Sequence, residues 1–192
     1  GIMKTANQII DELEELHCIN WRGPVAIVDD NFLGSKNEVK RNLLPSMKKW
    51  MQKHKYPFVF NIQSSINLAD DKELMSLMVE TGFTSTFIGI ETPDEISLNS
   101  CNKVQNKNRD LLQSVKTIQN TGLQVSGGFI VGFDSDTPSV FQRQIGVLGL
   151  QLLMVFSGRI EAGKFCEKKL FLAIEQFSCI ILLLYVESNS IT

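Results

Sequence analysis

Hydrophobic positions follow two alternating spacings along the chain, one typical of helices and one typical of buried strands. Thr5 and Gln8 have capping-box spacing, and the apolar residues that follow recur at helical intervals as far as Leu16, which predicts a helix. The β-branched run 25–28 is typical of a short buried strand. A second helical pattern follows, and Pro45 must kink or split that helix.

The same order of strand, polar loop and helix repeats along the chain. Apolar runs predict three further strands, at 58–62, 85–90 and 123–133, each followed by a helical pattern. This alternation predicts an α/β fold with a parallel sheet flanked by helices. Either a doubly wound open sheet or part of a TIM-type (β/α) barrel fits the pattern. No strand leads into GxGxxG or a Walker A motif, which disfavours nucleotide-binding open sheets.

Composition limits the class of protein. The 192 residues carry a formal net charge of -2 and are 43% hydrophobic, which suffices for a core and disfavours a general nucleic-acid binder. The longest apolar run, 180–186, is too short to span a bilayer, and no signal peptide follows Lys4. We therefore expect a cytoplasmic protein with free thiols. The cysteines are too scattered for a disulfide framework or a CxxC-type metal site: Cys18, Cys101, Cys166 and Cys179.

Candidate chemistry lies where the predicted strands end, since ligands bind at the carboxyl ends of parallel strands. The polar and glycine residues at these ends are Asp29, Asp30, Asn31, Gln63, Ser64, Ser65, Glu91, Gly127, Gly128, Gly132 and Asp134. Strand ends are also polar simply because loops begin there. Glu91 directly follows a buried strand and precedes the expected helix cap, which favours a ligand role. His17 and His54 lie at predicted helix ends, where we expect side chains that are solvated or that compensate the helix dipole, and that are not catalytic.

Three segments carry a family resemblance: 25–34, 87–93 and 127–134. Together they resemble the radical S-adenosylmethionine (SAM) enzymes, above all the branch with an N-terminal cobalamin-binding domain. The resemblance covers roughly residues 3–145. It implies a partial (β/α) barrel that binds SAM on a four-iron four-sulfur cluster and cleaves it reductively. Cobalamin would be the further cofactor of the full-length family.

The resemblance also implies roles for eight SAM-binding residues at the strand ends. The acids and the amide after the first strand would face the methionine amino group. The hydroxyl after the second strand and the carboxylate after the third would reach the ribose and the methionine carboxylate. The glycine-rich fourth strand would lie against the adenine. These residues are, in that order, Asp29, Asp30 and Asn31, then Ser65 and Glu91, then Gly128, Ile130 and Gly132.

Two departures from the family pattern shape our expectation. The cluster motif CxxxCxxC does not occur, and residues 146–192 contain no Asp, Pro, Trp or His and match nothing in the family. We expect a partial barrel core over 1–145 and an irregular, unassigned extension over 146–192 that is not homologous to the family. The chain would then be a fragment of a cobalamin-dependent-type methyltransferase or related radical enzyme acting on a small molecule. Alone, it would be catalytically inactive.

Two alternatives remain open. The first is a non-catalytic α/β binding or interaction module that retains the fold. The second is a conventional barrel enzyme that uses Asp29, Asp30 and Glu91 for metal binding or acid–base work, which is disfavoured because no histidine accompanies those acids at a strand end. We expect no metal site in this chain and assign no catalytic residue. A truncated barrel would also expose sheet edges through which copies could associate.

Overall fold

The structure is a computed structural model that describes residues 4–28, 36–100, 106–131, 133, 135–137, 139–140, 143, 153–159 and 180–185. The chain divides into two compact units. The first comprises Gly1–Phe87 and Gln113–Val125, and the second comprises Ile88–Leu112 and Ser126–Thr192.

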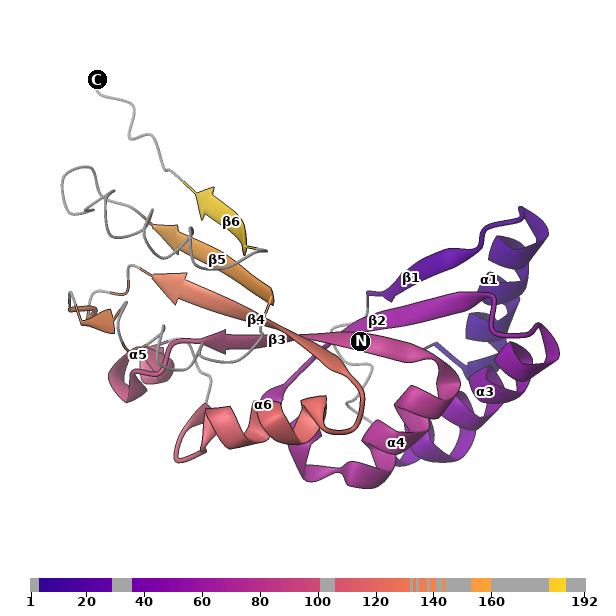
Figure 1. Cartoon of the computed structure of the whole chain (residues 1–192), viewed down its shortest axis with the longest axis horizontal. Coiled ribbons are helices and arrows are strands. Elements are labelled where there is room, and N and C mark those ends of the chain that lie inside the picture. The colour runs from indigo at the N-terminus through magenta and orange to yellow at the C-terminus, as the bar shows by residue number, and fades with distance from the viewer. Residues whose placement is uncertain are drawn as a thin grey trace, which may run out of the picture. The chain divides into compact units, whose positions relative to one another are not determined.

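Helices and strands alternate along the first unit (Figure 1). Its elements are α1 (Ala6–Cys18), β1 (Gly23–Ile27), α2 (Lys36–Glu38), η1 (Val39–Leu43), α3 (Leu44–Lys53), β2 (Phe58–Ser64), η2 (Ile66–Asp70), α4 (Lys72–Thr81), the first part of β3 (Phe83–Glu91) and most of α6 (Leu111–Gln119). β1 and β2 pair in parallel, with Gly23 opposite Phe58 and Ile27 opposite Ile62. Helix α3 contacts both α1 and α4.

Local signals set the helix boundaries of this unit. Both bonds of the capping box at α1 are present, because Gln8 N donates to Thr5 Oγ1 at 3.3 Å and Thr5 N donates to Gln8 Oε1 at 2.8 Å. At α4 the cap is Asp71, whose carboxylate accepts from Leu74 N at 3.0 Å. Asp70, one residue earlier, ends the 3₁₀ helix η2.

The predicted disruption at Pro45 takes the form of a π-helical turn. In η1 the chain widens, and Leu44 N donates to the carbonyl of Val39, five residues back. Helix α3 then begins with Pro45 in its first turn, where the missing N–H breaks no intrahelical bond. The prediction of a split helix is therefore confirmed.

Aromatic side chains form the centre of the first unit's core. Phe58 and Phe60 of β2 and Phe83 of β3 are buried, with neighbouring ring centroids 6.4 and 5.2 Å apart. Trp50 of α3 stacks on Phe58 at 5.6 Å and so joins the helix layer to the sheet. Such packed aromatic contacts supply much of the energy that holds a sheet against its helices.

The second unit contains the rest of β3, the helix α5 (Glu95–Ser100), the start of α6, β4 (Gln124–Val131), β5 (Leu153–Arg159) and β6 (Ile180–Tyr185). β5 pairs in parallel with both β4 and β6. The strands are hydrogen-bonded in the order of the chain, β1-β2-β3-β4-β5-β6.

The described elements confirm an α/β fold of parallel strands and flanking helices. β5 and β6 lie in the region for which the pattern predicted only an irregular segment, and both extend the sheet. No helix of the described residues is both long and apolar enough to cross a bilayer.

Candidate functional site

Half of the eight predicted SAM-binding residues lie in the described structure. Ser65 belongs to the first unit, and Glu91, Gly128 and Ile130 belong to the second. The other four fall outside the described residues: Asp29, Asp30, Asn31 and Gly132.

Ser65 directly follows β2, as predicted. Its side chain is exposed and occupies the N-cap position of η2, yet its hydroxyl makes no capping hydrogen bond. The turn is closed instead by the Ser65 carbonyl, which accepts from Leu68 N at 3.0 Å. The neighbouring Ser64 hydroxyl is 2.7 Å from Thr86 Oγ1, which ties the end of β2 to β3.

Glu91, the last residue of β3, has an unusual backbone conformation. Its φ angle is +65°, and Thr92 N donates to the carbonyl of Ile90 at 2.8 Å across it. An i-to-i+2 hydrogen bond around a residue with positive φ defines the rare, strained form of the γ-turn. Ile90 is fully buried, so the strand runs through the core and then turns sharply at Glu91. Strain of this kind in a non-glycine residue persists only where the surrounding structure enforces it, and strained residues cluster at functional sites.

Asn106 contacts the chain just before this turn. Its Nδ2 donates to the carbonyls of Gly89 at 3.2 Å and Ile90 at 2.9 Å, and its side chain is only 3% exposed. Sequence reasoning missed this residue. It lies in a polar stretch without apolar periodicity, and no local motif connects it to Glu91.

A hydrogen-bonded network fixes the loop that follows the turn. Asp94 Oδ1 accepts from Ser97 N at 3.1 Å and caps α5, while Asp94 Oδ2 lies 3.0 Å from Arg143 Nη1. The buried Ser97 hydroxyl is 2.6 Å from that of Ser135, beyond β4. The Ser97 amide, and then its hydroxyl and Arg143, hold the pKa of Asp94 below its usual range. The sequence predicted Thr92 as this cap, whereas the Thr92 hydroxyl accepts from Asp94 N.

β4 supplies the second feature of the site, next to β3 in the sheet. Gly128 and Ile130 are two residues apart and therefore share a face of the strand, whereas the buried Phe129 points to the other face. Gly128 is buried and Ile130 is half-buried. A glycine beside an aliphatic side chain lets a flat ligand approach the backbone and gives it an apolar surface.

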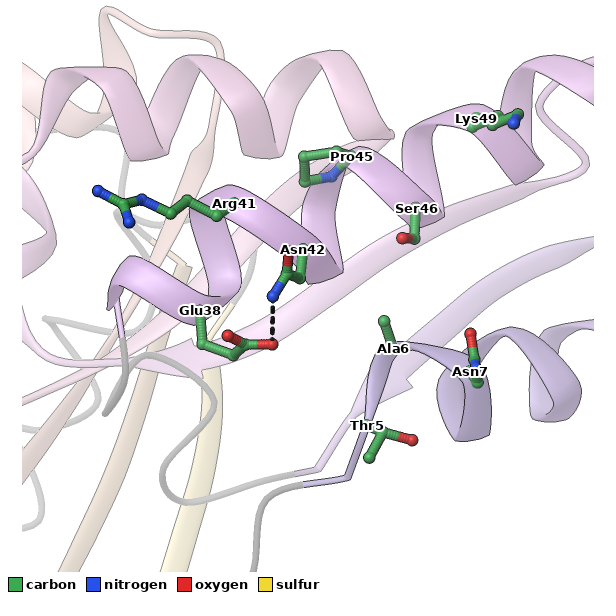
Figure 2. A pocket seen from close by; sticks show the side chains of 9 residues that line it. All are labelled: Thr5, Ala6, Asn7, Glu38, Arg41, Asn42, Pro45, Ser46 and Lys49. Carbon is green, nitrogen blue, oxygen red and sulfur yellow. Dashed lines mark hydrogen bonds between the residues drawn. The ribbon is translucent and has the colours of Figure 1, made fainter.

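An open cavity of about 510 Å³ lies elsewhere in the first unit (Figure 2). It is lined by Thr5, Ala6, Asn7, Glu38, Arg41, Asn42, Pro45, Ser46 and Lys49, none of which is a predicted SAM-binding residue. Figure 2 shows the cationic ends of Arg41 and Lys49 extending in opposite directions, so they do not converge on one anion. The cavity does not resemble a SAM pocket.

Metal ligands do not cluster within the described part of the chain. No group of three or more His, Cys, Asp or Glu residues there is placed to hold a metal ion. Cys18, at the end of α1, is exposed and free. With no CxxxCxxC in the sequence, the residues present do not fit an iron–sulfur cluster.

The chain is similar in sequence to two known methyltransferases. The chain is 49% identical over 140 residues to the uncharacterized methyltransferase sll1242 of Synechocystis sp., a match that covers 73% of this chain and 26% of that protein. It is 35% identical over 159 residues to the hopanoid C-2 methylase of Rhodopseudomonas palustris, covering 79% of this chain and 30% of that enzyme. The chain therefore spans under a third of the length of either relative. No protein-family model matches it.

Two solved structures share the fold at 14% identity. The radical SAM methyltransferase TsrM of Kitasatospora setae, with tryptophan and a SAM analogue bound, has a TM-score of 0.66 over 80% of this chain and 30% of its own. The cobalamin-dependent radical SAM enzyme OxsB, with aqua-cobalamin and SAM bound, has a TM-score of 0.61 over 90% of this chain and 26% of its own. The predicted resemblance is thus found at two levels: in sequence to two methyltransferases, and in fold to two cobalamin-dependent-type radical SAM enzymes. The α/β fold accordingly corresponds to a partial TIM-type barrel.

Proposed function

We propose that this chain forms the SAM-binding part of a radical SAM methyltransferase of the cobalamin-dependent type. The methyltransferase relatives and the shared fold support the class. The observation that supports the proposal for this chain is the strained γ-turn at Glu91, which ends β3, the strand next to the β4 that carries Gly128 and Ile130. The whole protein's substrate would be a small molecule.

Each predicted residue has a physical role in such a pocket. The Glu91 carboxylate would accept hydrogen bonds from ribose hydroxyls, and the Gly128–Ile130 face would receive the adenine ring. Ser65, in the first unit, has an exposed hydroxyl that makes no capping hydrogen bond, and the resemblance assigns this hydroxyl to the ribose or methionine carboxylate. Asp29, Asp30 and Asn31 would bind the methionine ammonium, and Gly132 would extend the adenine face. Bound SAM would supply the methyl group.

The pocket is tested by calorimetric titration of the chain with SAM. Glu91→Gln keeps the side-chain shape and removes its charge. Because hydrogen bonds to charged groups are worth about 1.5–3 kcal/mol, we expect Kd to rise by about 10-fold or more. Glu95→Gln is the matched control, since this exposed acid in the first turn of α5 should leave Kd unchanged. Equal effects of the two substitutions would contradict the proposal.

A second candidate function is a non-catalytic binding module that keeps the fold without the chemistry. The same titration separates the two candidates, because this module would show no SAM binding that depends on Glu91. Self-association through sheet edges stays a prediction under either function.

A further inference from the structure

Asn106 is a buried amide whose placement calls for an explanation. Its side chain is only 3% exposed, and among the described residues its Nδ2 donates to two main-chain carbonyls. Its Oδ1 is also buried and accepts no hydrogen bond from the described residues. A buried acceptor without a partner destabilises the fold, so an aliphatic side chain of the same size would be the more stable choice for packing alone.

The orientation of the amide is determined by its neighbours. Rotating it by 180° would place Oδ1 against the carbonyl oxygens of Gly89 and Ile90, and two acceptors repel each other at this distance. The amide therefore contributes two donors to two carbonyls, which no aliphatic, hydroxyl or carboxylate side chain of similar size can do. This double donation accounts for an amide at this position.

The two carbonyls that it joins are the last ones before the turn. In a regular strand, successive carbonyls point to opposite sides, so one amide reaches both only where the strand departs from that geometry. The Ile90 carbonyl also accepts from Thr92 N across the γ-turn, at 2.8 Å. Asn106 thus contacts the same oxygen that closes the strained turn around Glu91.

We propose that Asn106 is a positioning residue that holds Glu91 in its left-handed γ-turn and so presents the Glu91 carboxylate to the ribose hydroxyls of SAM. The ligand half of this inference rests on the proposed function. The coupling between Asn106 and the Glu91 backbone stands without it, and the two halves are tested by different measurements.

The backbone half is tested by thermal unfolding of variants at both positions. Glycine adopts a φ of +65° without the steric cost that alanine has. With Asn106 present, Glu91→Gly should therefore melt about 2–4 °C above Glu91→Ala. With Asn106→Leu, which keeps the volume and removes both donors and the unpaired oxygen, the difference should vanish or reverse. Asn106→Ala provides a second background if the leucine does not fit. An equal difference with and without Asn106 would overturn the proposal.

The ligand half is tested by SAM titration of Asn106→Leu, Glu91→Gln and the double variant. If Asn106 acts through Glu91, Asn106→Leu should weaken binding about 10-fold, and the double variant should bind about as weakly as Glu91→Gln alone. Unchanged binding by Asn106→Leu, or fully additive losses, would contradict it. If the unsubstituted chain does not bind SAM, the proposed function fails, while the melting comparison still decides whether Asn106 holds the turn.

Discussion

His17, near the end of α1, shows how a single side chain can make the first unit sensitive to pH. Its ring lies 4.5 Å from that of His54 and 5.8 Å from that of Trp50, and its Nε2 is 3.0 Å from Arg22 Nη2. Burial, followed by Arg22 and His54, lowers the pKa of His17 from its ordinary value of 6.5, while Glu14 opposes the shift. His54 is not solvated, since its side chain is only 14% exposed, whereas the half-buried His17 lies in the last turn of α1, where a dipole-compensating side chain was expected.

A lowered histidine pKa has a defined consequence for stability. The folded state disfavours the proton on His17, so stability is fully present above pH 6.5 and falls as the pH drops toward the lower folded pKa. We expect His17→Gln, which cannot charge, to flatten the dependence of Tm on pH between about 7.5 and 5. Circular-dichroism melts at a series of pH values measure this. An unchanged slope would contradict this role for His17.

At the scale of elements, two glycines end helices of the first unit in left-handed conformations that differ in their surroundings. Gly82, after α4, has a φ of +110°, and a Cβ added there would lie 3.0 Å from the Met51 methyl. Gly122, after α6, has a φ of +101°, and a Cβ added there would lie 3.8 Å from its nearest neighbour, a methyl of Val79. Both Gly→Ala substitutions should lower the free energy of unfolding by about 1–2 kcal/mol through backbone strain. Gly82→Ala should cost more, because the buried Met51 must also move. Denaturant unfolding compares them, and a larger loss at Gly122 would contradict the steric argument.

The elements also show which features a sequence pattern can predict. The Thr5 capping box, the split at Pro45 and the end of α4 at Gly82 depend on residues within one or two turns, so spacing rules predict them. The γ-turn at Glu91 could not be predicted this way, because its support comes from Asn106, 16 residues beyond Ile90. The position of Glu91 at a strand end was predictable, but its strain was not.

At the scale of the molecule, sequence order and spatial units do not coincide. β3 and β4 each begin in the first unit and end in the second. Their carboxyl ends, with Glu91 and the Gly128–Ile130 face, therefore belong to a unit that also contains β5 and β6. The strands β5 and β6 were not predicted, because apolar runs without caps or turn residues do not distinguish a strand from a helix or an irregular segment.

The cysteines of this chain limit the cluster chemistry that it can carry out by itself. Holding a four-iron four-sulfur cluster requires a set of thiolates at close spacing, and the chain offers only Cys18, Cys101, Cys166 and Cys179, none within CxxxCxxC. Anaerobic reconstitution of this chain with iron and sulfide should therefore give no stoichiometric cluster, and incubation with SAM and a reductant should release no 5′-deoxyadenosine.

The controls for this experiment use SAM binding itself as the reference. If the chain binds SAM with a Kd that depends on Glu91 and still forms no cluster, the pocket and the redox centre are separable, as the proposed function requires. Iron and sulfide analysis together with chromatography of the products decides the matter. A cluster at one equivalent with turnover of SAM would show that these scattered thiols can assemble a redox centre, and the assignment of this chain to SAM binding alone would then be wrong.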